Sequence, residues 1–152
     1  TIDDVQIMIA GKNERPFGDG RMAGEEIQEH RPFGGAARIR HVAGDEILMD
    51  VAAILKRSVR NVDYVARYGG EEFVVVLVET ALDVALDIAE RIRSEVEIPR
   101  FGVRDTLSSV TMSLGVTHSR EDDDGPEEVL ARADHALYEA KRAGRNQVQH
   151  AM

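Results

Sequence analysis

The stretch Arg67-Tyr-Gly-Gly-Glu-Glu-Phe73 lies between two apolar segments and decides the fold. The segment from Val62 to Tyr68 precedes its paired glycines, and the segment from Phe73 to Val78 follows its paired glutamates. Two short apolar segments joined by a glycine-containing turn are typical of a β-hairpin. The sequence therefore predicts a strand, a tight turn and a buried strand, with two adjacent carboxylates at the turn.

Helical patterns flank this hairpin. Residues 45–60 carry apolar side chains at 3.6-residue spacing, and Thr80-Ala-Leu-Asp83 resembles a capping box for a helix that extends to about Glu97. A third helix is expected between Pro126, which suits a first helical turn, and Gly144, which suits the position after the last turn. The sequence thus predicts amphipathic helices before and after the hairpin.

The alternation of apolar and small residues from Val110 to Val116 predicts a further, half-buried strand. Strands interleaved with helices, one pair of them joined by a hairpin, predict an α/β fold (an α+β sandwich) with a mixed central sheet and flanking helices. A length of 152 residues fits a single domain, 1–152, around one core. Residues 11–40 hold six of the 13 glycines, so we expect 1–40 to be rich in loops and 41–150 to hold the regular elements.

The composition excludes several classes of protein. The chain has 43% hydrophobic residues, as globular domains do, and no cysteine, which excludes disulfides, thiolate zinc sites and thiol catalysis. A net charge of −9 opposes binding to a nucleic-acid polymer. The longest apolar run, Phe73 to Val78, is too short to span a bilayer, so we expect no direct membrane contact. Because the sequence begins at Thr1, we expect a longer parent protein, which could be membrane-anchored elsewhere.

The turn of the hairpin is a candidate site for a metal ion and a nucleotide. Gly69 and Gly70 lack a Cβ, so a ligand can approach their backbone, and Glu71 and Glu72 supply hard oxygen ligands. Magnesium usually takes one or two carboxylates and completes its coordination with water and phosphate oxygens. On these residues alone, a plain hairpin with solvated acids is an equally good interpretation.

Several separated motifs resemble the GGDEF-domain diguanylate cyclases, in their Gly-Gly-Glu-Glu-Phe form. Between about His41 and Val148 they are His41-Val-Ala-Gly-Asp-Glu46, Arg60-Asn-Val-Asp63, Arg67-Tyr-Gly-Gly-Glu-Glu-Phe73, Val110-Thr-Met-Ser-Leu-Gly115 and Ala133-Asp-His-Ala-Leu-Tyr-Glu-Ala-Lys-Arg-Ala-Gly-Arg-Asn146. The resemblance implies a palm-like nucleotidyl-cyclase fold that condenses two GTP into cyclic di-GMP and releases two pyrophosphates. It also implies Mg²⁺ or Mn²⁺ as cofactor, a cytoplasmic location in a bacterium, and a homodimer, because each domain holds one GTP.

The resemblance assigns roles to the residues of the turn. Glu71 resembles the metal ligand of the family, and Glu72 resembles its second ligand or the group that activates the attacking hydroxyl. Arg67 belongs with these two residues to the catalytic set. Gly69 and Gly70 belong to the substrate-binding set, since their backbone would lie against GTP.

Three further residues are expected to bind GTP. Lys141 and Arg145, four positions apart on one face at a helix end, resemble the family residues that bind the terminal phosphates. Asp45 resembles the aspartate that recognises guanine. Two plainer interpretations stay open, namely cations that complement a helix dipole and an aspartate that caps a helix N-terminus.

Arg60 and Asp63, with Arg91 on the next helix, resemble the inhibitory site of the family for cyclic di-GMP. There the arginine binds a phosphate or guanine edge of the product, and the aspartate recognises guanine. We therefore expect the product to restrain synthesis. The alternative is an exposed Arg–Asp pair worth at most ~1 kcal/mol, with Arg91 on a solvated helix face.

The N-terminal third departs from the family pattern. Counting back from His41 without a gap, Gln28 stands where the family has a metal-binding aspartate, and Ala36 stands where it has a guanine-binding asparagine. A one-residue deletion would place Glu29 at the metal position instead. Three functions therefore stay open: a working diguanylate cyclase, a catalytically weak receptor module that binds cyclic di-GMP, and a structural output domain that only dimerises.

Overall fold

The computed structural model describes residues 6–14, 36–97, 101–103, 106–108 and 110–152, with side chains for 45–97 and 110–152. Its elements are, in chain order, β1 (Gln6–Glu14), α1 (Ala36–Ser58), β2 (Tyr64–Gly69), β3 (Glu72–Leu77), α2 (Leu82–Glu97), β4 (Phe101–Val103), β5 (Thr106–Ser108), β6 (Val110–His118), α3 (Pro126–Arg142) and β7 (Val148–Ala151).

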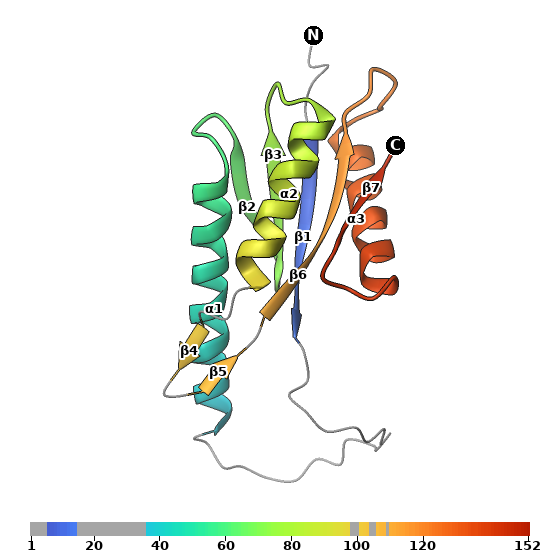
Figure 1. The fold of residues 1–152 in the computed structure, drawn as a ribbon. Coiled ribbons are helices and arrows are strands. Elements are labelled where there is room, and N and C mark those ends of the chain that lie inside the picture. Colours follow the sequence, from blue (N-terminus) through green and yellow to red (C-terminus); the bar gives the residue numbers. More distant parts are fainter. Residues whose placement is uncertain (1–5, 15–35, 98–100, 104–105, 109) are drawn as a thin grey trace.

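A five-stranded sheet forms the centre of the fold, in the order β2-β3-β1-β6-β7 (Figure 1). The middle strand β1 pairs antiparallel with β3 and with β6, and β2 pairs antiparallel with β3. The last strand, β7, runs parallel to β6, while β4 and β5 form a separate two-stranded ribbon. The predicted α/β class with a mixed central sheet is therefore confirmed.

The central strand β1 is the main element that the sequence patterns miss. It ends in Gly11-Lys-Asn-Glu14, which shows no apolar alternation and falls in the segment expected to be loop. Pairing with β3 on one side and β6 on the other supplies the stabilisation that local propensity does not. No local pattern predicts the short strands β4, β5 and β7 either.

The helices follow the predicted periodicity, except at the start of the first one. α1 begins at Ala36 rather than at residue 45, because the alanines and arginines of its first turns favour a helix and the later apolar stripe anchors it by packing. Asp45 therefore lies inside α1, so its interpretation as an N-cap is wrong. Within the described part of the chain, none of the helices is long and apolar enough to cross a bilayer.

The helices cover both faces of the sheet. α1 and α2 lie on one face and α3 on the other (Figure 1), so the sheet divides the apolar side chains into two clusters in place of the single core expected. The larger cluster joins α1 and α2 to the sheet, and the smaller one joins α3 to β3. Because helices cover both faces, the central strands β3 and β6 are buried on both sides.

β6 is buried on both faces, so the prediction of a half-buried strand is wrong. Thr111 and Ser113, on the face expected to meet solvent, are 2% and 0% exposed. Gly115 explains how α3 can pack so closely there, because a Cβ at this position would collide with the backbone of Ala133 and Leu137. Small residues alternating with large ones thus mark close helix packing here rather than exposure.

The predicted hairpin is confirmed. β2 and β3 pair up to Gly69 and Glu72, and the turn between them contains Gly70 with a φ of +33°. β3 is largely buried, whereas β2 forms an exposed edge of the sheet. The two glutamates therefore lie at the turn, at one end of the sheet.

A buried ion pair secures the start of α3. Both guanidinium nitrogens Nη1 and Nη2 of Arg132 donate to the Asp123 carboxylate, and Nη2 also donates to the His118 carbonyl at the end of β6 (2.9 Å). The two side chains are 15% and 7% exposed. Chiefly through the hydrogen bonds from Arg132, the pKa of Asp123 falls to about 2.

We expect Asp123→Asn to lower the free energy of unfolding at neutral pH, by an amount that depends on pH. Because the folded-state pKa is depressed, the charged carboxylate stabilises the fold above its unfolded pKa of about 3.9, and this contribution disappears as the pH falls through about 2. Urea unfolding of the two proteins between pH 7 and pH 2 measures it. A difference in stability that stays constant down to pH 2 would contradict the role of this charge.

Candidate functional site

The tip of the β2–β3 hairpin meets the end of α3. Nζ of Lys141, in the last turn of α3, lies 3.1 Å from Oε1 of Glu72, and the two side chains are 32% and 37% exposed. Glu71 is exposed in the turn beside them. The fold therefore brings the ammonium group of Lys141 next to two adjacent carboxylates that precede it by about 70 residues in the sequence. We call Arg67, Gly70, Glu71, Glu72 and Lys141 the hairpin-tip cluster.

Arg67 stabilises the shape of this turn. Its Nε and Nη2 donate to the carbonyl oxygen of Gly70 at 2.9 and 2.6 Å. Arg67 lies in β2, just before the turn, and its guanidinium bonds across the turn to Gly70. These bonds hold the backbone of the paired glycines in place. In this arrangement Arg67 positions the turn, whereas its assignment to the catalytic set stays a prediction.

A cavity of about 500 Å³ lies between α1 and the hairpin, a size that suits a nucleotide base with its sugar. Asp45 and Arg67 provide its charged groups, and its apolar lining comes from Leu48, Met49, Ala52, Val65 and Phe73. Asp45 is exposed and lies within α1, not at its N-terminus, and from this position it lines the cavity. The structure therefore places Asp45 and the hairpin around one cavity, and the recognition of guanine by Asp45 stays a prediction.

Lys141 and Arg145 do not share a helix face. α3 ends at Arg142, and the backbone after it takes positive φ values of 121° at Gly144 and 62° at Arg145. The expectation that both cations project from one helical face is therefore wrong, because the chain reverses at Gly144 before it reaches Arg145. Of these two cations, only Lys141 lies in the last turn of α3, where it also complements the helix dipole.

The donor set at the hairpin tip fits a hard divalent cation. Glu71 and Glu72 offer carboxylate oxygens, and Mg²⁺ needs only one or two carboxylates when water and phosphate oxygens complete its coordination. Among the residues that the structure describes, no group of three His, Asp or Glu side chains could hold a metal by itself. Glu29 and Gln28 lie outside the described residues, and of Ala36 only the backbone, at the start of α1, is described.

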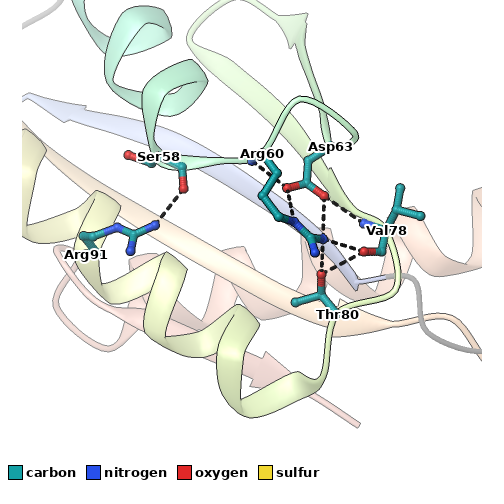
Figure 2. Close-up of polar contacts among 6 residues, drawn as sticks. All are labelled: Ser58, Arg60, Asp63, Val78, Thr80 and Arg91. Carbon is teal, nitrogen blue, oxygen red and sulfur yellow. Dashed lines mark hydrogen bonds and ion pairs between the residues drawn. The ribbon is translucent and has the colours of Figure 1, made fainter.

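A second polar cluster forms at the opposite end of the hairpin, where β2 begins and β3 ends. Figure 2 shows the Arg60 guanidinium between Asp63 and Thr80. Its Nη2 donates to Oδ1 of Asp63 (2.9 Å), to the Val78 carbonyl (2.5 Å) and to Oγ1 of Thr80 (2.7 Å), and its Nε donates to Oδ2 of Asp63 (3.1 Å). We call Arg60, Asp63, Thr80 and Arg91 the Arg60 cluster.

Asp63 is a buried member of this cluster. Its side chain is 0% exposed, against 54% for Arg60. The amides of Arg60 and Val78 also donate to it, at 2.8 and 3.1 Å. Burial by itself raises the pKa of Asp63, but these hydrogen bonds and those of the Arg60 side chain outweigh it, so the pKa lies below its ordinary value. The alternative of an exposed surface pair therefore holds for Arg60 but not for Asp63, which is buried beneath it.

Arg91 approaches the same region from α2. Its Nη2 donates to the carbonyl of Ser58, at the C-terminal end of α1, over 2.7 Å (Figure 2). The side chain thus bridges two helices, while Arg91 itself remains exposed, as the alternative of a solvated helix face predicts. Arg60 and Arg91 accordingly present two guanidinium groups around the end of α1, while Asp63 lies enclosed behind Arg60.

Some polar contacts in and near these clusters have no signal in the sequence. Thr80 fits the start of α2, yet its hydroxyl accepts from Arg60, a contact that depends on β3 ending beside β2. Arg93 and Asn146 hydrogen-bond across 53 positions of sequence, and neither spacing nor residue type indicates it. Only the quoted motif that ends at Asn146 marks that residue as noteworthy.

Comparison with known proteins identifies the family. The sequence model of the family described as "Diguanylate cyclase, GGDEF domain" matches residues 39–147, which include both clusters. The chain belongs to the GGDEF domain family. Diguanylate cyclase A of Treponema denticola is 45% identical over 71% of this chain, and the response regulator PleD of Caulobacter vibrioides is 49% identical over 71%. The chain spans 29% and 24% of the length of these two relatives.

Solved GGDEF structures share the fold. The diguanylate cyclase SiaD of Pseudomonas aeruginosa, solved with its activator SiaC, matches 98% of this chain and 50% of its own with a TM-score of 0.77 and 28% identity. The GGDEF domain of DgcB from Caulobacter crescentus, solved with c-di-GMP, matches 96% of this chain and 78% of its own with a TM-score of 0.72 and 29% identity.

Proposed function

We propose that this GGDEF domain condenses two molecules of GTP into cyclic di-GMP, in the bacterial cytoplasm, and that it binds its product at the Arg60 cluster. The observation that carries the proposal is the hairpin-tip cluster, in which Glu72 and Lys141 meet beside the cavity of Asp45. Membership of a family of diguanylate cyclases supports the same chemistry.

The geometry suggests how one GTP would lie. Guanine would occupy the cavity between α1 and the hairpin, where the Asp45 carboxylate can accept from two N–H groups of its edge. The triphosphate would then extend along the glycines of the turn toward Lys141 and Arg145. This orientation places the α-phosphorus near the hairpin tip, where the 3′-hydroxyl of a second GTP must arrive from another copy of the domain.

Glu71 and Glu72 are the residues that would hold Mg²⁺ or Mn²⁺. When bound, such an ion neutralises charge on the phosphate oxygens during in-line displacement. Lys141 already neutralises part of the charge on Glu72 through their ion pair. The pair keeps both side chains pointing into the site before substrate enters, and the triphosphate would then compete for Lys141.

A receptor function without catalysis is the second candidate. It is favoured by the hydrogen bonds that join Arg60, Asp63 and Thr80 and by the nearby Arg91, together with the unmatched family positions Gln28 and Ala36. Such a module would bind cyclic di-GMP and transmit the signal without making it. The two candidates differ in one measurable property, the formation of product from GTP.

The expected result is that the purified domain forms cyclic di-GMP from GTP and Mg²⁺, with an initial rate that rises faster than linearly with protein concentration. Each copy holds only one of the two GTP molecules, so the rate follows the concentration of dimers until they saturate. Chromatographic assay of product across a dilution series measures this. Binding of cyclic di-GMP with no product at any concentration would favour the receptor, and strict proportionality would indicate a preformed dimer or a different chemistry.

A further inference from the structure

The turn that follows α3 has an unusual backbone. Gly144, Arg145 and Asn146 all have positive φ values, of 121°, 62° and 48°. Glycine adopts this region freely and asparagine tolerates it, but arginine seldom does. Non-glycine residues in the left-handed region cost of order 1–3 kcal/mol each and persist only where the surroundings hold them. The contacts that stabilise this turn therefore indicate whether its conformation serves a function.

The backbone of the turn is tied to the helix before it and to the strand beside it. The amide of Arg145 donates to the carbonyl of Ala140 (3.0 Å), and Nε2 of Gln147 donates to the same carbonyl (3.0 Å). The amide of Leu114 in β6 donates to the carbonyl of Gln147 (3.0 Å). These bonds fix where the turn starts and where it ends.

Asn146 fixes the middle of the turn from three directions. Its amide donates to the hydroxyl of the buried Ser113 (3.1 Å), its Nδ2 donates to Oε1 of Glu97 (2.9 Å), and its Oδ1 accepts from Nη1 of Arg93 (2.8 Å). Arg93 is itself only 16% exposed and forms ion pairs with Glu90 and Glu97 on α2. The side chain of Asn146 is thus bound to charged partners on a helix that precedes it by about 50 residues.

We infer that Asn146 and Arg93 are positioning residues that hold the left-handed turn and thereby orient Arg145 toward the terminal phosphates of GTP. This inference rests on the proposed function, because it takes Arg145 to be a phosphate-binding residue. The hairpin tip, the C-terminal end of α2 and this turn all lie at the same end of the molecule (Figure 1). A guanidinium attached to a backbone with one fixed conformation loses only side-chain entropy, and no backbone entropy, when it binds a phosphate.

The competing explanation is that the network only fastens the turn between α3 and β7 to α2 and β6. Both explanations predict a loss of stability when Asn146 is changed, so stability alone does not separate them. They differ in which part of the nucleotide is affected. Orientation of Arg145 concerns the terminal phosphates, whereas a general loosening of the domain would weaken binding of the base and sugar as well.

The test measures the affinity for a non-hydrolysable GTP analogue and for GMP, by calorimetry, in the wild type and in Arg145→Ala, Asn146→Ala and the double variant. We expect Arg145→Ala to weaken binding of the GTP analogue roughly 10–100-fold, and Asn146→Ala roughly 3–10-fold, because the second variant keeps the guanidinium but not its orientation. In the double variant, Asn146→Ala should add no further loss, and binding of GMP should change in none of them.

Two further variants complete the design. Arg93→Lys keeps the charge but cannot bond Glu90, Glu97 and Asn146 together, so it should weaken binding of the GTP analogue less than Asn146→Ala and leave GMP unaffected. Asp123→Asn is the control, because it breaks a buried ion pair at the opposite end of α3. It should lower stability without changing either affinity.

The outcomes separate this inference from the proposed function. Equal losses for the GTP analogue and GMP, or a full additional loss in the double variant, would overturn the positioning role. A loss in Arg145→Ala with none in Asn146→Ala would also overturn it and leave the proposed function intact. Unchanged affinity in Arg145→Ala would remove Arg145 from the phosphate site and overturn this inference alone. The proposed function, which rests on the hairpin-tip cluster, would be overturned by a wild type that binds no GTP analogue.

Discussion

Glu71→Gln is expected to lower Mg²⁺-dependent formation of cyclic di-GMP about 100-fold or more, because a bound cation supplies several kcal/mol of charge stabilisation and each 1.36 kcal/mol is a factor of ten in rate. Glutamine keeps the shape of the side chain but removes the charge that attracts the metal ion. Glu71 lies exposed in the hairpin turn, so the substitution should change the thermal midpoint of unfolding very little.

The measurement is product formation at saturating GTP across a range of Mg²⁺ concentrations, with circular dichroism to follow unfolding. Mn²⁺ binding, detected by its paramagnetic resonance in the presence of a GTP analogue, gives a readout that does not depend on turnover. Glu121→Gln is a matched control, because Glu121 is also exposed in a turn but lies outside both clusters. Turnover and Mn²⁺ affinity equal to those of the wild type would remove Glu71 from the metal site.

Local patterns predict those parts of the fold whose stability is local. Paired glycines predict the β2–β3 hairpin, and the periodicity of α2 and the residues Pro126 and Gly144 predict two helices almost to the residue. β1 is different, because its partners β3 and β6 come much later in the chain and supply what its own sequence lacks. A central strand with a polar end is stabilised by tertiary pairing, which single-sequence periodicity does not detect.

The candidate site likewise has features that local patterns predict and features that depend on tertiary contacts. The carboxylates at the hairpin tip follow from the turn motif, but the ion pair between Glu72 and Lys141 depends on α3 packing across the sheet at Gly115. Helical spacing places Lys141 and Arg145 on one face, and the left-handed backbone at Gly144 separates them. The burial of Asp63 depends on the chain returning past it at Val78, a contact that the Arg-x-x-Asp spacing does not contain.

Substitution of Arg60 is expected to weaken binding of cyclic di-GMP by about 1.5–3 kcal/mol, the usual worth of a hydrogen bond to a charged group, or roughly 10–150-fold. GTP binding should remain nearly intact, because the Arg60 cluster and the hairpin tip lie at opposite ends of the β2–β3 hairpin. A cyclic dinucleotide carries two phosphates and two guanine edges, and the planar guanidinium matches both.

The choice of variant matters because Asp63 is buried. Arg60→Ala would leave the Asp63 carboxylate without its ion-pair partner, and an unpaired buried charge lowers the stability of the whole domain. Arg60→Lys keeps a positive charge beside Asp63 but removes the two-pronged geometry that the ligand requires. A loss of affinity for cyclic di-GMP in Arg60→Lys, with an unchanged thermal midpoint, therefore reports on the ligand and not on the fold.

Calorimetry with cyclic di-GMP and with a GTP analogue, on the wild type and both variants, decides between the two roles of Arg60. If all three proteins bind cyclic di-GMP equally, the guanidinium serves only to neutralise Asp63 and to join β3 to α2 through Val78 and Thr80. If GTP affinity falls in Arg60→Ala but not in Arg60→Lys, the alanine variant has disturbed the fold. A selective loss for cyclic di-GMP in both variants identifies Arg60 as a ligand-binding residue, with the buried Asp63 holding its guanidinium in place.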